Sequence, residues 1–221
     1  MELLALGLRP FREVWDLQKK LQQGLINAQA NDTLILCQHY PVVTNGRSGS
    51  EINLLLTKDQ LRSIGIEYYE IERGGDVTYH GPGQIVVYPI LNLNRYKKDV
   101  GWYMRTLETA LITTLESFHV PAMQIPGRTG VWTDASSKIA SIGVRISRWC
   151  TMHGLALNVS DQSGGFRHIN PCGFKGINIS YAEQFGAIKQ EEMAKALIEN
   201  LRQALIETSN PTSLQTSEVT G

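Results

Sequence analysis

The chain has 221 residues, which at a typical domain size of roughly 150 residues allows one large domain or two small ones. Hydrophobic residues make up 42% and charged residues 19%, the composition of a soluble globular protein, so extensive disorder is excluded. The 21 Lys and Arg balance 21 Asp and Glu. A net charge of zero provides no long-range field for binding nucleic acid or an anionic membrane in bulk.

The first third of the chain predicts alternating helices and strands. The apolar run 3–8 is too short and wrongly flanked for a secretory signal, so no export is expected. Apolar residues three or four apart over 11–30 predict an amphipathic helix, and the branched run 33–37 predicts a strand with an exit loop over 39–47. A brief helix near 57–63 and a strand near 66–71 follow.

The middle of the chain begins with a glycine-rich stretch, 73–84, which leads into a strand over 85–91. Charge is sparse over 77–94, but the glycines and prolines there exclude a membrane-spanning helix, so no membrane association is expected. Apolar spacing predicts a helix over 99–119. Three strand-like runs, 130–134, 138–146 and 152–159, then predict an antiparallel meander.

The last predicted element is a helix over 190–207. The Ser- and Thr-rich residues 209–221 have no apolar face to bury, so a polar, disordered tail is expected there. No internal repeat or linker divides the rest. The chain is therefore predicted to form a single α+β domain over 1–208, with a mixed or antiparallel β-sheet flanked by helices.

The glycine-rich stretch is the densest group of candidate functional residues. Its glycines let the backbone pass close to a ligand, and Arg73, Thr78, His80 and Gln84 supply hydrogen-bonding groups. The spacing matches neither the phosphate-binding loop that ends in Gly-Lys-Ser/Thr nor the dinucleotide pattern Gly-x-Gly-x-x-Gly. An ordinary turn between strands is the alternative, but the number of polar side chains favours a binding site.

A second candidate is Cys172, which a proline precedes and a glycine follows. Such a turn can hold a thiol at a surface, but a reactive thiolate needs a nearby base or cation. Candidate partners are Lys138, His80, His153 and Lys175. Taken alone, a cysteine such as Cys172 is more often an inert small hydrophobe, and a lysine such as Lys138 is more often a solvated charge at the edge of a sheet. His153 could belong to the core or to the pocket wall.

The other two cysteines are weaker candidates. Cys37 lies in an apolar run and fits an inert buried thiol, and Cys150 has no evident helper. An odd number of cysteines in a chain of this size favours free thiols and a reducing, cytoplasmic location. The sequence contains no Cys-x-x-Cys or His-Glu-x-x-His pattern, so no metal site is expected.

Five segments together carry a resemblance to a known family. They are Arg73-Gly-Gly-Asp-Val-Thr-Tyr-His-Gly-Pro-Gly-Gln84, Gly127-Arg-Thr-Gly-Val-Trp132, Lys138-Ile-Ala-Ser-Ile-Gly143, His153-Gly-Leu-Ala-Leu-Asn158 and Asn170-Pro-Cys-Gly173. Over residues 30–180 the chain closely resembles the lipoyl(octanoyl) transferases, which share a fold superfamily with biotin and lipoate protein ligases. Five motifs in the right order are far more specific than one.

The resemblance implies an acyl transfer in two steps. Octanoyl would move from acyl carrier protein to Cys172 as a thioester, and then to the ε-amine of a lysine on a lipoyl domain. The acceptors implied are the lipoyl domains of 2-oxoacid dehydrogenase E2 subunits and the H protein of glycine cleavage. Lys138 would shuttle the proton and lower the pKa of Cys172, and no cofactor is implied.

The resemblance also implies which residues bind the acyl substrate. They are Arg73, Gly74, Gly75, Asp76, Val77, Thr78, Tyr79, His80, Ser141, Ile142, Gly143, Gly154, Leu155 and Ala156. The main alternative is an ATP-dependent lipoate or biotin protein ligase, in which Cys172 would have no role. A carrier-binding module without turnover is a further alternative, which the presence of both Cys172 and Lys138 disfavours.

Overall fold

The computed structural model describes residues 1–171 and 176–207. Its main sheet is mixed, with β1 parallel to β2 and the other neighbours along its path antiparallel. In spatial order the strands are β1 (Glu2–Arg9), β2 (Thr33–His39), β6 (Gln84–Ile90), β10 (Cys150–Asn158), β9 (Ser137–Ser147), β8 (Arg128–Trp132) and β7 (Met123–Ile125), with β11 (Asn178–Ile179) beside β9. A smaller sheet has the order β4 (Glu67–Glu70), β3 (Val42–Asn45) and β5 (Thr78–His80).

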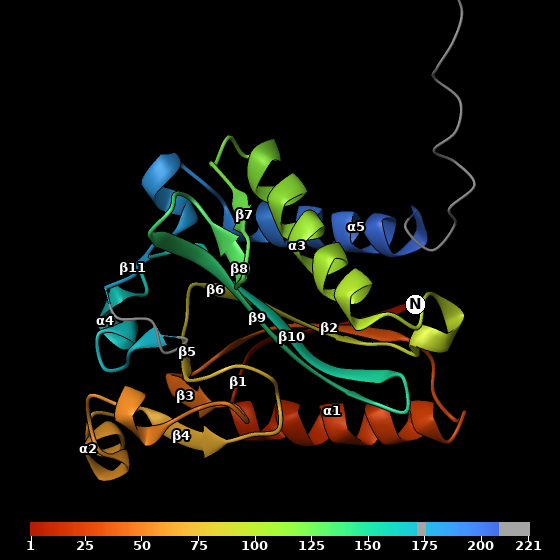
Figure 1. Ribbon diagram of the computed structural model, residues 1–221, viewed down its shortest axis with the longest axis horizontal. Helices are drawn as coiled ribbons and strands as arrows, with labels where there is room; N and C mark the ends of the chain where they lie inside the picture. Colours follow the sequence, from red (N-terminus) through yellow and green to blue (C-terminus); the bar gives the residue numbers. More distant parts are fainter. Residues whose placement is uncertain (172–175, 208–221) are drawn as a thin grey trace, which may run out of the picture.

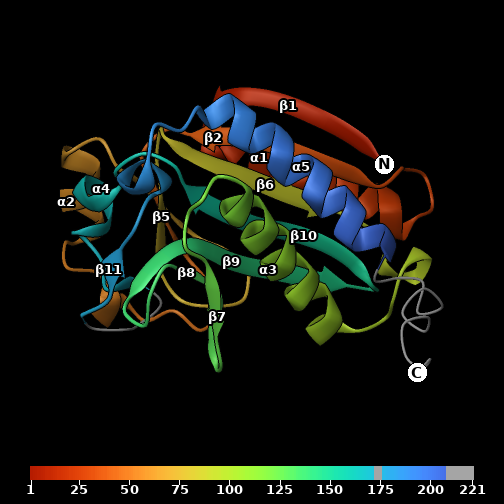
Figure 2. The ribbon, with the colours of Figure 1, turned by 90° about the horizontal axis from the view of Figure 1, so that it is seen from above.

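Helices cover both faces of the main sheet (Figure 1). On one face lie α1 (Phe11–Ile26) and the smaller sheet, and on the other α3 (Val100–Ser117) and α5 (Gln190–Glu207) pack against each other. Seen from above, α3 and α5 lie side by side over the strands (Figure 2). The shorter helices are α2 (Lys58–Ser63) and α4 (Ser163–Phe166), with 3₁₀ turns at Glu51–Asn53, Leu93–Arg95 and Ala182–Phe185.

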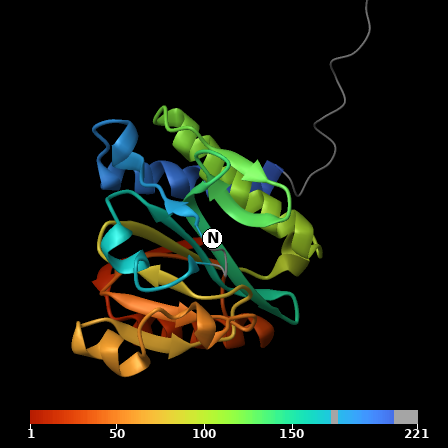
Figure 3. The same cartoon turned by 60° about the vertical axis from the view of Figure 1, so that its left-hand side comes forward.

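The central strands are apolar on both sides because each side faces a covered layer. Along β6 the side chains alternate, with Ile85 and Val87 in the core beneath α3 and α5, and Val86 and Tyr88 in the core beneath α1. The turned view in Figure 3 shows these layers on either side of the sheet. Among the described residues, no helix is long and apolar enough to span a bilayer.

The predicted fold class is confirmed, since the structure is one α+β domain with a mixed sheet flanked by helices. The helix over 190–207 matches α5, and the predicted meander is the antiparallel set β8, β9 and β10. The two residues of its second turn, Arg148 and Trp149, both have positive φ, as in the type I′ turn that suits a twisted hairpin. The predicted tail 209–221 lies outside the described residues.

The short strands β7 and β11 were not predicted, and three further strands differ from the prediction. The run 39–47 was expected to be a loop, but β3 occupies Val42–Asn45, directly after Pro41, and includes the asparagine of the Asn-Gly pair that suggested a loop. β5 lies inside the glycine-rich stretch, where glycines obscure the strand pattern. β1, for which no strand was predicted, pairs with β2 across the intervening helix α1. Such pairings depend on residues distant in the sequence, which local patterns do not report.

Candidate active site

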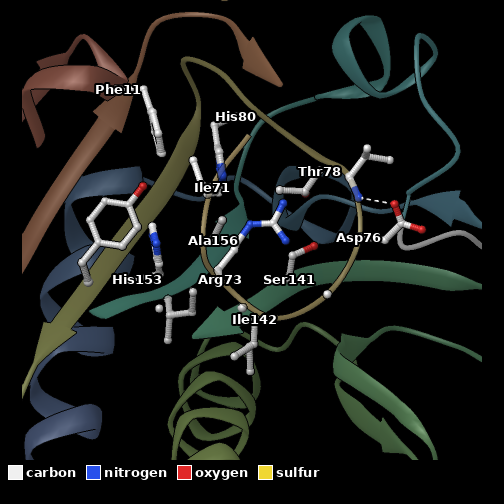
Figure 4. Close-up of a pocket in the computed structure, with 16 residues that line it drawn as sticks. Phe11, Ile71, Arg73, Asp76, Thr78, His80, Ser141, Ile142, His153 and Ala156 are labelled. Atoms are coloured by element: carbon white, nitrogen blue, oxygen red, sulfur yellow. Dashed lines mark hydrogen bonds between the residues drawn. The ribbon is translucent and has the colours of Figure 1, made fainter. Parts of the chain in front are cut away.

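A narrow pocket lies between the main sheet and the loop that joins β4 to β5 (Figure 4). Its free volume is about 50 Å³, well below the roughly 300 Å³ at the lower end for ligand pockets. An extended ligand therefore requires the lining side chains to move apart. The lining residues are Phe11, Ile71, Arg73, Gly75, Asp76, Val77, Thr78, His80, Tyr88, Ser141, Ile142, Gly143, His153, Gly154, Leu155 and Ala156.

The pocket brings together the three segments that the family resemblance implies for binding the acyl substrate. Twelve of the fourteen residues expected to bind the acyl substrate line this pocket, and they lie within 73–80, 141–143 and 154–156. Two members of the set, Gly74 and Tyr79, are not among the described lining residues. The N–H of Gly74 donates to the carbonyl of Val144 (2.9 Å), and the Tyr79 ring packs against Phe166 with ring centres 5.6 Å apart.

Arg73 holds the loop to the smaller sheet. Its guanidinium is buried and donates from Nη2 to the carbonyl oxygen (2.7 Å) and the hydroxyl (3.0 Å) of Thr44 on β3, and from Nη1 to the carbonyl oxygen of Gly74 (3.0 Å). Gly143 on the facing strand permits this approach, since a Cβ there would lie 2.9 Å from Arg73 Cδ. Charge-assisted bonds of this kind keep the loop against the pocket.

Asp76 orders the backbone at one end of the pocket. Its Oδ1 accepts from the N–H of Val77 (2.7 Å, dashed in Figure 4), and its Oδ2 accepts from Asn53 Nδ2 (2.5 Å). The carbonyl oxygen of Asn53 accepts from the N–H of Asn170 (2.8 Å). The glycine-rich loop is thereby linked to a residue two positions before Cys172, which itself lies outside the described residues.

A buried polar chain runs from the pocket to the strand that carries Lys138. Gln84 Nε2 donates to a backbone carbonyl (3.1 Å) and to Asn158 Oδ1 (2.9 Å), so its Oε1 accepts from His80 Nδ1 (3.1 Å). Asn158 Nδ2 donates to the carbonyl of Ser180 (3.1 Å), whose N–H donates to the carbonyl of Lys138 (2.9 Å). This chain fixes the His80 proton on Nδ1.

Lys138 is almost fully buried, with 3% of its surface exposed. It is not among the described residues that line the pocket. Its Nζ lies 5.3 Å from the centre of the Trp132 ring, a cation–π contact. Gly130 on β8 leaves room for it, since a Cβ at that position would lie 2.7 Å from Lys138 Cε and 3.2 Å from Nζ. The amine is thus held against β8, beside the pocket.

Two buried histidines, His80 and His153, line the pocket, and a third, His39, lies beside His80 with ring centres 5.9 Å apart. Burial lowers the pKa of His39 to about 4. Burial, with His39 and Arg73 nearby, lowers the pKa of His80 to about 3, and burial with Arg73, Arg145 and Lys19 lowers that of His153 to about 3. All three rings are therefore neutral near pH 7.

Sequence reasoning assigned no role to three lining residues, Phe11, Ile71 and Tyr88. Phe11 begins α1 and Tyr88 lies on β6, where an aromatic residue in an apolar pattern is typical of a core. Asn53 and Thr44 were also missed. Their roles depend on contacts with Asp76 and Arg73, which no local motif indicates. Within residues 1–171 and 176–207, no group of three or more His, Cys, Asp or Glu is placed to hold a metal ion.

Comparison with known proteins identifies the family of this chain. Residues 10–207 match the lipoyl protein ligase A/B catalytic domain. The octanoyltransferase of Christiangramia forsetii is 37% identical over 223 residues, covering 92% of this chain and 94% of that protein. The octanoyltransferase of Bacteroides fragilis is 43% identical over 201 residues, covering 86% of this chain and 91% of that protein.

Solved structures show the same fold at lower identity. A bipartite lipoate protein ligase from Thermoplasma acidophilum, described with its E2 lipoyl domain, has a TM-score of 0.73 at 16% identity and covers 93% of this chain and 83% of that chain. A biotin protein ligase from Aquifex aeolicus has a TM-score of 0.55 at 13% identity and covers 94% of this chain and 72% of that chain.

The chain belongs to the family of lipoyl protein ligase A/B catalytic domains. Its relatives at about 40% identity over most of its length are octanoyltransferases. The chain is accordingly an octanoyltransferase, an enzyme of protein lipoylation.

Proposed function

We propose that the chain transfers octanoyl from acyl carrier protein to the thiol of Cys172, and from there to a lysine ε-amine on a lipoyl domain. The acceptors on this proposal are the lipoyl domains of 2-oxoacid dehydrogenase E2 subunits and the H protein of glycine cleavage. The reaction belongs in the cytoplasm, because a nucleophilic thiol must stay reduced. The observation that carries the proposal is the pocket formed from the three segments 73–80, 141–143 and 154–156.

Each half-reaction exchanges one bond at the acyl carbon. In the first, the Cys172 thiolate attacks the donor thioester, a new C–Sγ bond forms, and the donor sulfur leaves and takes up a proton. In the second, the lysine amine attacks, an amide forms, and Cys172 leaves as a thiolate while the amine loses a proton. Thioester exchange is nearly balanced in energy, so the enzyme-bound acyl group stays reactive toward the amine.

Lys138 is the proposed proton carrier for both steps. It accepts the Cys172 proton and returns it to the donor sulfur, and it accepts the proton of the attacking amine in the second step. Its burial against Trp132 and Gly130 supports this role, because a side chain held in one place can meet successive reactants. The link from Asp76 through Asn53 to Asn170 supports a position for Cys172 near the same end of the pocket.

A local basic patch of Arg145, Arg148 and Lys175 is the candidate surface for the acidic carrier protein, because the chain as a whole has no net charge. Arg145 lies on β9, seven positions after Lys138, which at about 3.3 Å per residue is roughly 23 Å. Arg148 lies in the turn that follows β9. Arg145 also pairs with Glu72 at 3.1 Å. Lys175 lies outside the described residues.

The choice of acyl donor tests this function against ATP-dependent ligation. Wild type and Cys172→Ala are each mixed with an apo lipoyl domain and either octanoyl-acyl carrier protein or free octanoate with ATP and Mg²⁺. We expect wild type to modify the domain from the carrier-bound donor alone, and Cys172→Ala to lose that activity by at least about 10³-fold. Modification from free octanoate and ATP by both proteins would instead establish a ligase.

A further inference from the structure

His153 carries three unfavourable features at one position. Its backbone has φ +62°, in the left-handed region that a side chain of this size rarely adopts. The residue is 1% exposed, and within the described part of the chain its Nε2 has no hydrogen-bond partner. The carboxylate oxygen Oε2 of Glu72 lies 3.9 Å from that nitrogen, beyond hydrogen-bonding distance. Backbone strain and an unsatisfied buried polar group persist mainly where function needs them.

His153 lies at the end of the pocket opposite Asp76. In Figure 4 His153 and Phe11 lie at one end, Thr78 and Asp76 at the other, and Arg73 between them. The strand register gives the same order, because Ala156 pairs with Ser141 and His153 with Val144, farther along β9 from Lys138. The reactive end, near Lys138 and the residues that precede Cys172, is therefore the Asp76 end.

His153 lies between the pocket and a partly exposed ion pair. The ring lines the pocket, and the Tyr88 ring packs against it at an interplanar angle of 78°, with ring centres 6.4 Å apart. Nearby is the ion pair of Glu72 and Arg145, whose side chains are 18% and 33% exposed. Without the imidazole, the far end of the pocket would open toward this charged, partly hydrated pair.

We propose that His153 is the chain-length stop of the acyl pocket, closing its far end so that medium-length chains fit and longer ones are rejected. The inference rests on the proposed acyl-binding role of the pocket. The rejection is steric, because β10 pairs with β9 at His153 itself and with β6 from Leu155 onward, and a longer chain can advance only by displacing the ring. The backbone next to the ring is also tightly packed, since a Cβ added at Gly154 would lie 2.2 Å from the carbonyl oxygen of Val87.

Substitution by glycine is suited to test this, because glycine adopts φ +62° without strain. Transfer rates are measured with octanoyl-, decanoyl- and dodecanoyl-acyl carrier protein for wild type and His153→Gly. We expect the ratio of dodecanoyl to octanoyl transfer to rise at least tenfold in His153→Gly, because each additional buried methylene strengthens binding by roughly fourfold.

His119→Gly is the matched control. His119 also has positive φ (+58°) but is exposed and far from the pocket lining, so this variant should keep the wild-type ratio. His153→Asn provides a second variant, because asparagine tolerates positive φ and is shorter than histidine. An unchanged ratio in both His153 variants would overturn the inference. Failure of wild type to transfer octanoyl through Cys172 would overturn the proposed function instead, so the two failures are distinguishable.

Discussion

Replacing Lys138 by methionine is expected to slow octanoyl transfer by roughly 10² to 10⁴-fold, the usual contribution of a positioned acid–base group. Methionine keeps much of the apolar stem that packs beside Trp132 and Gly130 and removes the amine. Both half-reactions should slow, because the same amine serves each. Single-turnover rates of enzyme acylation and of transfer to the lipoyl domain measure the two steps separately.

Displacing the amine without removing it gives an independent check. Alanine at Gly130 would place its Cβ 2.7 Å from Lys138 Cε and 2.4 Å from the carbonyl oxygen of Ala140, so it shifts the lysine together with the contact between β8 and β9. Alanine at Gly127 meets nothing within 4 Å. Both glycines have positive φ, +110° and +78°, so both substitutions strain the backbone, but Gly130→Ala alone should slow transfer at least tenfold. Lys189→Met, at an exposed lysine, should leave the rate unchanged. Wild-type rates in folded Lys138→Met would contradict the proton-carrier role.

The second large effect expected is acid sensitivity of the fold. The folded pKa values of His39, His80 and His153 are about 4, 3 and 3, below the usual 6.5 of an unfolded chain. Below pH 6.5 the unfolded chain therefore binds protons that the folded protein excludes, so stability falls as pH falls. The slope should approach about 4 kcal/mol per pH unit between roughly pH 5.5 and 4.

Urea unfolding at pH 8, 7, 6 and 5 measures this dependence. The free energy of unfolding should be about 6 kcal/mol lower at pH 5 than at pH 8, a large part of the roughly 5 to 15 kcal/mol of an ordinary domain. His39→Gln should reduce the slope by about a third, because its amide can replace the neutral ring without titrating. A free energy that stays constant from pH 8 to pH 5 would show that these histidines titrate normally in the folded protein.

Much of the fold follows from local patterns in the sequence. Helix periodicity placed α1, α3 and α5, and the alternation of Ile142, Val144 and Ile146 with smaller or polar residues indicated the meander strand β9. Local patterns do not show which strands pair with one another. β1 and β3 were missed because their pairing partners, β2 and β4 among them, are distant in the sequence.

The pocket was partly predictable for a similar reason. Glycines and polar residues in Arg73–His80 mark a binding loop by composition alone, and the pocket is formed by that loop against β9 and β10. Phe11, Tyr88 and His153 close its far end from three separate elements, α1, β6 and β10, and their meeting depends on tertiary packing. The burial of Lys138 along β8, rather than in the pocket wall, likewise depends on the space left by Gly130.

The most direct test of the central claim is intact-protein mass spectrometry after mixing with octanoyl-acyl carrier protein, without a lipoyl domain. Wild type should gain the mass of one octanoyl group, hydroxylamine should remove it, and peptide mapping should place it on Cys172. Cys172→Ser should form no hydroxylamine-labile adduct, while Cys37→Ser, at a buried thiol outside the proposed chemistry, should be acylated like wild type. Wild-type protein that modifies a lipoyl domain at full rate without ever carrying an acyl group would contradict the thioester route.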